Sequence, residues 1–297
     1  MAARSAHAQA TPKFEYGKPE EVKAVEWKAQ AKGGFLLTTG NSQTQGGVFA
    51  ANVSRKEGNN KLALEGGVAY GHTNNRFAVP VAGTTTYEVQ RIEVTSTNNY
   101  YGKGRYDRFF TTNNAGYLSA QAGADKIVGK SFFGGGQIGY SRQLYKSDLQ
   151  LVVAELGYDL SHERYVQQPP KVLDPVTIHS ARVFVGESLK LSAATGVTAS
   201  VEALFNLNKE VAAIDVSTAM PGVPAFKDTR VLGKLGLTTT LFKQLSIGFG
   251  FTLKYDQNPA LAPRPSNAAA TDTPVNPNEF ADKVDTLSEV TLIFTFL

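Results

Sequence analysis

The residues Leu245–Asp256 read Leu-Ser-Ile-Gly-Phe-Gly-Phe-Thr-Leu-Lys-Tyr-Asp, alternating between apolar and small or polar side chains. In an extended chain, successive side chains point to opposite faces. This stretch therefore predicts a β-strand with one apolar face, because a helix would distribute the same residues around its circumference.

The same period of two recurs along the rest of the chain. It predicts about twelve strands, near residues 25–38, 45–56, 61–73, 87–107, 116–125, 131–143, 149–162, 177–191, 197–209, 229–242, 245–257 and 283–297. Most of these segments exceed the ~5–6 residues of an ordinary soluble strand. They match the ~9–11 residues that a tilted strand needs to cross a bilayer.

Composition excludes several other classes. The 297 residues include 28 glycines, no cysteine and only 19% charged side chains. No apolar run approaches the ~18–20 residues of a spanning helix. Without cysteine there is no disulfide framework or thiolate metal site. The formal net charge of +4 is dispersed, and no basic block indicates nucleic-acid binding.

The links between the predicted strands alternate in length. Short links fall at residues 57–60, 111–115, 144–148, 193–196 and 242–244, and longer links at 73–86, 167–176, 210–228 and 258–282. The links at 40–43 and 126–130 are brief but fall on the long-link side. Short turns at one end and long loops at the other are typical of outer-membrane barrels. We therefore expect an all-β fold, a closed antiparallel transmembrane β-barrel with up-and-down topology. A soluble β-sandwich or lectin-like domain is the alternative.

The N-terminal residues carry a processing signal. Ala6-His7-Ala8-Gln9-Ala10 has the small-x-small shape of a signal-peptidase site, although no apolar segment precedes it. We interpret residues 1–10 as the remnant of a signal peptide, 11–24 as a mobile periplasmic leader and 25–297 as the barrel. The alternative is an alanine-rich terminus without a targeting role. An even number of strands places both termini in the periplasm.

Aromatic side chains gather near both predicted membrane interfaces, as in the girdles of such barrels. Near the short-turn end lie Trp27, Tyr106, Phe109, Phe110, Tyr140, Phe242, Phe294 and Phe296. Near the long-loop end lie Tyr70, Tyr158, Tyr165, Phe205 and Tyr255. The alternative role of these rings is packing in a sheet core.

The opposite face of the strands is expected to line the lumen, with acids and bases in similar number. The bases are Lys28, Lys32, Lys61, Lys103, Arg105, Arg182, Lys190, Arg230, Lys234 and Lys254. The acids are Glu26, Glu65, Asp107, Asp125, Glu155, Asp159, Glu202, Asp256, Asp285 and Glu289. These charges either pair across the lumen or line a slim polar pore, and strand register decides between them. Glu187 departs from the pattern, because its position in the alternation faces lipid.

Catalytic chemistry has little support in the sequence. His72, His162 and His179 fall near the long-loop rim, where Ser161, Ser180 and Glu163 are close in sequence. Adjacent residues such as Ser161 and His162 point to opposite faces and cannot form one relay. No nucleotide, zinc or nucleophile-elbow motif occurs, so we expect no catalytic residue, metal or cofactor and no enzymatic activity.

Three segments resemble those of a known family. Lys32-Gly33-Gly34-Phe35-Leu36-Leu37-Thr38-Thr39-Gly40-Asn41-Ser42-Gln43-Thr44 is similar to the opening hairpin of the YdiY-like salt-induced outer-membrane proteins. Tyr106-Asp107-Arg108-Phe109-Phe110 and Gly157-Tyr158 followed by His162-Glu163-Arg164-Tyr165 resemble two later elements. The resemblance implies the barrel and a link to salt stress, and no catalytic residue.

These observations favour a narrow, general or weakly selective pore, or an envelope-integrity barrel linked to salt or osmotic stress, in a Gram-negative outer membrane. An outer-leaflet hydrolase that uses the rim histidines, and a receptor or adhesion surface on the loops, are the alternatives. Expected partners are membrane lipid, lipopolysaccharide, small solutes or ions, and the assembly machinery. That machinery would read the alternating C-terminal strand, which carries Phe294 and Phe296 before Leu297.

Overall fold

The computed structural model describes residues 22–37, 42–80, 87–126, 129–167, 174–209, 222–258 and 283–296. These residues form twelve strands: β1 (Val22–Leu37), β2 (Ser42–Gly58), β3 (Asn60–Pro80), β4 (Tyr87–Thr111), β5 (Asn114–Asp125), β6 (Lys130–Lys146), β7 (Gln150–Tyr165), β8 (Val176–Lys190), β9 (Thr195–Asn206), β10 (Thr229–Phe242), β11 (Leu245–Asp256) and β12 (Val284–Thr295). In the described part of the chain, no helix is long and apolar enough to span a bilayer.

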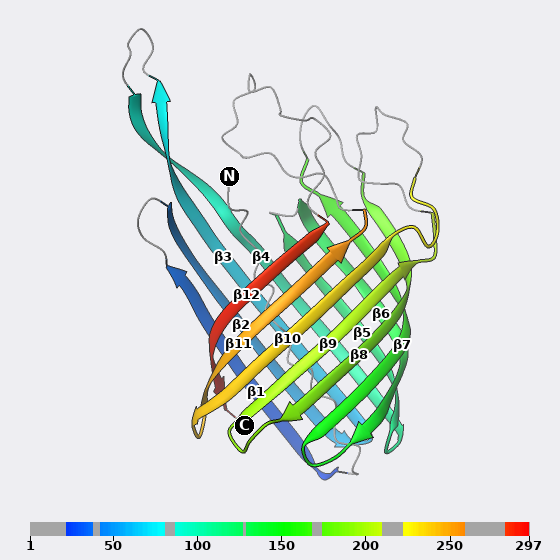
Figure 1. Cartoon of the computed structure of the whole chain (residues 1–297). Helices are drawn as coiled ribbons and strands as arrows, with labels where there is room; N and C mark the ends of the chain where they lie inside the picture. Colours follow the sequence, from blue (N-terminus) through cyan, green and yellow to red (C-terminus); the bar gives the residue numbers. More distant parts are fainter. Residues whose placement is uncertain are drawn as a thin grey trace.

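The strands form one closed barrel in which each strand pairs antiparallel with its neighbours in the chain. Pairing of β1 with β12 completes the cylinder (Figure 1). Closure leaves no sheet edge unpaired, as a bilayer requires of a spanning sheet. The predicted fold, an up-and-down antiparallel barrel of twelve strands, is confirmed.

Alternate side chains of each strand face outward and inward. On β6, the outward Ile138 is 57% exposed, whereas Gln137 and Ser141 on the opposite face are buried. The same division holds on β3, where Leu62 and Leu64 are exposed and Lys61 is buried. The barrel therefore has an apolar exterior and a polar interior, the reverse of a soluble β-protein.

The hairpin of β3 and β4 is longer than the sequence pattern predicts. The expected loop 73–86 is wrong over its first half, because register pairs continue from Thr73↔Val94 to Pro80↔Tyr87. A register shift between Gly71 and His72 precedes this extension. In Figure 1 the hairpin rises beyond the rim of the barrel. The alternation there carries polar residues on both faces, so it gave no strand signal.

Other boundaries differ by a few residues at strand ends. The first strand begins at Val22, before the expected start at residue 25. Residues 1–10 and the leader up to residue 21 lie outside the described part of the chain. The same is true of most of the predicted loops, 210–221 of the loop 210–228 and 259–282 of the loop 258–282.

The seam that closes the barrel is short. Only Gln30↔Thr295, Ala31↔Phe294, Lys32↔Ile293 and Gly33↔Leu292 pair between β1 and β12. By contrast, β11 and β12 pair continuously from Leu245↔Phe294 to Tyr255↔Val284. The closing contact is therefore the smallest in the barrel by register length.

Candidate functional site

A charged cluster in the barrel interior is centred on Glu155 of β7. Arg105 of β4 donates from Nη2 to Glu155 Oε1 at 2.6 Å and from Nη1 to Oε2 at 3.1 Å. Arg182 of β8 donates from Nη1 to Oε2 at 2.8 Å, and the Ser141 hydroxyl donates to Oε1 at 3.1 Å. The Glu155 side chain is fully shielded from solvent. Two guanidinium groups and a hydroxyl thus satisfy one buried carboxylate, as such burial requires.

Tyr117 of β5 lies between the two guanidinium groups. Its ring centroid is 4.3 Å from the Arg105 guanidinium carbon and 5.5 Å from that of Arg182. Its hydroxyl accepts a hydrogen bond of 2.8 Å from Arg182 Nη1. The ring extends over Gly139 and Gly157, where a Cβ atom would meet the Tyr117 hydroxyl. The two glycines therefore make room for the aromatic bridge.

Further contacts extend this cluster along the inner wall. Arg182 Nε donates to Glu202 Oε1 at 2.9 Å, and Arg105 Nε donates to Asp107 Oδ1 at 2.9 Å. Gln137 Nε2 donates to Asp159 Oδ1 at 2.9 Å, and Ser161 Oγ donates to Asp159 Oδ2 at 2.6 Å. Ion pairs and hydrogen bonds thus connect inward side chains from β4 to β9.

A second charged group lies nearer the long-loop end. Lys130 Nζ is 2.6 Å from Glu163 Oε1, and Arg230 Nη1 is 3.6 Å from the same oxygen. The Tyr165 hydroxyl donates to Glu163 Oε2 at 3.0 Å. Arg230 Nε also lies 3.7 Å from Asp228 Oδ2. This group links β6 and β7 to β10 across the interior.

The opposite side of the interior is open. A cavity lies between β1–β3 and β9–β12. Small side chains line much of it, including Ala50, Gly236, Gly248 and Gly250. Hydroxyl and amide groups alternate with them: Gln30, Asn52, Thr198, Ser200, Thr238 and Thr291.

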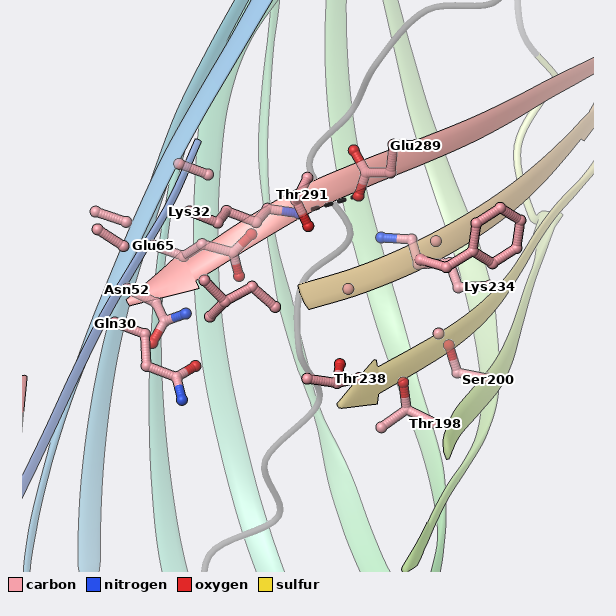
Figure 2. A pocket seen from close by; sticks show the side chains of 18 of the residues that line it. Gln30, Lys32, Asn52, Glu65, Thr198, Ser200, Lys234, Thr238, Glu289 and Thr291 are labelled. Atoms are coloured by element: carbon pink, nitrogen blue, oxygen red, sulfur yellow. Dashed lines mark hydrogen bonds and ion pairs between the residues drawn. The ribbon is translucent and has the colours of Figure 1, made fainter. Parts of the chain in front are cut away.

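Few charges enter this cavity. Lys32 Nζ is 3.1 Å from Glu289 Oε1, and Tyr101 donates its hydroxyl proton to Glu65 Oε1 at 2.6 Å. Figure 2 shows this ion pair on one wall, with the Lys234 side chain directed into the same space. The lumen is therefore divided into an ion-paired half and an open polar half.

The predicted lumen residues fall on both halves of this interior. The ion-paired half contains Arg105, Asp107, Glu155, Asp159, Arg182 and Glu202, while Arg230 joins the group at the long-loop end. On the open half, Lys32, Glu65, Lys234 and Glu289 line the cavity.

The other predicted lumen residues lie elsewhere on the strands. Lys61 is buried, and Lys28 lies 3.6 Å from Glu26 with both side chains well exposed. Lys103, Lys254 and Asp256 lie at inward positions of β4 and β11, in register with Glu65, Asp285 and Arg230.

Two carboxylates, one interior and one on the outer face, depart from this arrangement. Asp125 is 2% exposed, and neither of its carboxylate oxygens has a hydrogen bond within the described residues. Glu187 lies on the outer face of β8, where Gln150 Nε2 donates to Glu187 Oε1 at 2.6 Å. The register of β8 is continuous at Glu187, so no bulge turns it inward.

Most predicted girdle residues lie on the outer surface. Trp27, Tyr70, Tyr106, Tyr140, Tyr158, Phe294 and Phe296 are exposed, and Phe205 and Tyr255 are half-buried. The interpretation is wrong for Phe109 and Tyr165, which are 4% and 7% exposed. Phe109 lies two residues from the interior Asp107, and Tyr165 lies two residues from the interior Glu163. Residues two apart in a strand share a face, so the alternation alone predicts that both rings point inward.

Two of the three rim histidines, His162 and His179, contact hydroxyl groups on the outer face. His162 Nδ1 lies 2.9 Å from Thr177 Oγ1, and His179 Nδ1 is hydrogen-bonded to the Tyr158 hydroxyl. Ser161 lies on the other face of β7, bonded to Asp159. No Ser/His/acid relay forms among the described residues, and no group of three or more acidic or histidine side chains there could hold a metal ion.

Several interior residues carry no charge, so the pattern of acids and bases does not predict them. Tyr101, Tyr117, Gln137 and Ser141 hold the carboxylates in place, and all four have the inward parity of their strands. That parity was visible in the alternation. The pairing of Arg105 with Glu155 was not, because it depends on which strands meet across the lumen.

A closed barrel with an apolar exterior and a polar interior is a transmembrane β-barrel. The chain belongs to the family described as "Protein of unknown function, DUF481", which it matches over residues 31–296. This match confirms the resemblance to the YdiY-like barrels. No curated protein matches the chain.

Solved structures with a similar arrangement share little sequence with this chain. The translocator domain of the autotransporter NalP from Neisseria meningitidis has 13% identity and a TM-score of 0.43, with 92% of this chain and 88% of that chain covered. The outer membrane channel DcaP of Acinetobacter baumannii has 9% identity and a TM-score of 0.35, covering 92% and 97%. In-vitro folded OmpT, an outer membrane protein of Vibrio cholerae, has 10% identity and a TM-score of 0.37, covering 93% and 100%.

Proposed function

We propose that this barrel lies in a Gram-negative outer membrane, with periplasmic termini, and acts as a narrow, non-enzymatic pore for small solutes or ions. The open half of the lumen carries the proposal. Its cavity lies between β1–β3 and β9–β12 and is lined largely by small and hydroxyl side chains. Such a lining offers hydrogen bonds to water and leaves space for it.

The ion-paired half of the lumen is the reason to expect a narrow pore. A barrel of about twelve strands lies between small filled barrels and wide water-filled porins. Here the side chains of Arg105, Glu155, Arg182 and Tyr117 occupy part of the cross-section. Permeation is therefore confined to the remaining cavity, which excludes large solutes.

The same ion pairs favour a second candidate, an envelope-integrity barrel that conducts nothing and is linked to salt or osmotic stress. Contacts across the interior brace the wall in a way that a pore does not need. In this case the barrel has no solute as a partner. Its partners are lipid, lipopolysaccharide and the assembly machinery, which would recognise the C-terminal strand. The hydrolase alternative has weaker support, since His162 and His179 already contact Thr177 and Tyr158 on the outer face.

Planar-bilayer recording of the refolded chain tests the pore. We expect discrete current steps of small amplitude. Replacing Ser200, which lines the cavity, by Trp should reduce the amplitude of each step, because the indole fills the cavity. The adjacent Val201 is 52% exposed on the outer face, so Val201→Trp is the matched control and should leave the steps unchanged. Folded protein without current steps would favour the envelope-integrity barrel.

A further inference from the structure

An arginine of β7 is exposed on the outer face of the barrel, at the end where the long loops begin. Arg164 shares this face with Tyr158 and Leu160, because residues an even number apart on a strand point the same way. Its guanidinium carbon is 5.8 Å from the ring centroid of Phe132, its register partner on β6. Phe132 is exposed too, so a guanidinium group and an aromatic ring lie together at the long-loop border of the apolar exterior.

Arg164 has no counter-charge in the part of the chain that the structure describes. It forms no ion pair with any carboxylate there. The adjacent Glu163 points into the lumen, where it pairs with Lys130, and the exposed Asp174, which follows β7, forms no ion pair either. The five N–H donors of the guanidinium group are therefore available to an acceptor outside the chain.

Two histidines add donors to the same outer surface. His162 lies two residues before Arg164 on one face of β7, which places their Cα atoms ~6.6 Å apart. Its Nδ1 is 2.9 Å from Thr177 Oγ1, and His179 Nδ1 is hydrogen-bonded to the Tyr158 hydroxyl. Neither Nε2 has a hydrogen bond to another described residue. When Nδ1 accepts a hydroxyl proton, the neutral ring carries its own proton on Nε2 and can donate it.

The outer face next to these groups is apolar and carries little side-chain bulk. Gly136 of β6 is the register partner of Leu160 on one side and of Ala120 of β5 on the other. Leu160 and Ile138 are exposed around it. An acyl chain can lie against such a surface, between the larger side chains. Charged groups at the rim and apolar groups nearer the strand centres follow the order of headgroup and acyl chain in a membrane lipid.

We propose that Arg164 and His162, with the Phe132 ring beside the guanidinium group, bind a phosphate group of lipid A, the membrane anchor of lipopolysaccharide. Guanidinium groups bind phosphate through paired hydrogen bonds, and basic side chains at a membrane surface attract anionic headgroups. A phosphate monoester carries more negative charge than the phosphodiester of a phospholipid, so lipid A is the preferred ligand. The site rests on the proposed outer-membrane location with the long loops outside, and it does not depend on conduction.

Native mass spectrometry of the refolded, detergent-solubilised chain tests the site, with diphosphorylated lipid A as the probe. Wild type should bind lipid A, and H162Q/R164Q should bind it at least about tenfold more weakly, because charge-assisted hydrogen bonds to phosphate are lost. Arg142 is exposed near the short-turn end of β6 and likewise has no ion pair with a described residue, so R142Q is the matched control and should bind as wild type. A gel-mobility shift on heating shows that each variant is folded. Equal affinity of folded H162Q/R164Q and wild type, or an equal loss in R142Q, would overturn the site.

Two further probes identify the source of the phosphate. Lipid A without its phosphates should bind wild type at least about tenfold more weakly, and millimolar inorganic phosphate should not displace intact lipid A. Displacement by inorganic phosphate would overturn a lipid ligand, and equal binding of phosphatidylglycerol would overturn the preference for lipid A. A chain that binds lipid A without giving current steps loses the pore and keeps the site. Current steps from a folded chain that does not bind lipid A would give the reverse.

Discussion

Arg105 on β4 and Glu155 on β7 form an ion pair of 2.6 Å across the inside of the barrel, although β5 and β6 separate their strands. This contact is made by side chains that meet through the lumen, and no backbone pairing requires it. It fixes one half of the interior as a packed polar core. The open half is what remains of the cross-section.

Glu155→Ala should strongly destabilise the barrel. The substitution leaves Arg105 and Arg182 without their shared carboxylate in a site shielded from water. Removing one partner of a buried ion pair costs about 3–5 kcal/mol. Urea unfolding in lipid vesicles measures the loss. The control is Glu57→Ala, which breaks an exposed pair with Arg55 and should cost no more than about 1 kcal/mol. Equal losses of stability in the two variants would contradict a stabilising role for the charged cluster centred on Glu155.

Gly139→Ala should impair folding of the chain. A Cβ at Gly139 would lie 2.6 Å from the Tyr117 hydroxyl and 2.8 Å from the Gly157 Cα, closer than packed atoms approach. Either the sheet or the Tyr117 ring must move, which disturbs the contact with Arg182. Gly33→Ala is the control, because a Cβ there meets nothing within 4 Å. The yield of folded barrel after refolding measures both, and a normal yield for Gly139→Ala would show that the ring is not tightly held.

Ile138→Arg tests whether the outer face of β6 contacts lipid. Ile138 lies in the middle of β6 and is 57% exposed, and Leu144 near the end of the same strand is 58% exposed. An arginine at the bilayer midplane costs about 2–4 kcal/mol, but only about 0–1 kcal/mol near the interface. Unfolding in vesicles should therefore show a much larger loss for Ile138→Arg than for Leu144→Arg. A soluble barrel would tolerate both substitutions equally.

The closing seam should be the most dynamic part of the wall. β1 and β12 share four register pairs, from Gln30↔Thr295 to Gly33↔Leu292, whereas β11 and β12 share eleven, from Leu245↔Phe294 to Tyr255↔Val284. Fewer hydrogen bonds resist local opening there. Hydrogen exchange read by mass spectrometry should therefore be faster in β1 than in β6 and β7. Uniform protection around the barrel would show that the seam is held by other contacts.

The sequence was sufficient to predict the barrel, because each strand shows the period of two within its own residues. Leu245–Asp256 has the alternation that the structure shows as an outward apolar face on β11. The length of the β3–β4 hairpin was not predictable in this way. Residues 73–80 pair with β4 beyond the barrel rim, where no apolar face distinguishes a strand from a loop.

The interior could be predicted only residue by residue. Parity identifies Arg105 and Glu155 as inward positions, but it does not say that they meet. That contact depends on the register of every intervening strand and on the size of Tyr117 between the two arginines. The division of the lumen into an ion-paired half and an open half follows from such pairings, so it becomes visible only in three dimensions.

The central claim, a polar path along the open half of the lumen, is tested most directly by cysteine accessibility, because the chain has no native cysteine. Ser200→Cys places a thiol in the cavity, and Ser119→Cys places one in the ion-paired half, where Ser119 is 5% exposed. During single-channel recording, a charged, water-soluble thiol reagent should reduce the current of Ser200→Cys and leave that of Ser119→Cys unchanged. A current in Ser200→Cys that persists unaltered after complete modification of the thiol would contradict the claim.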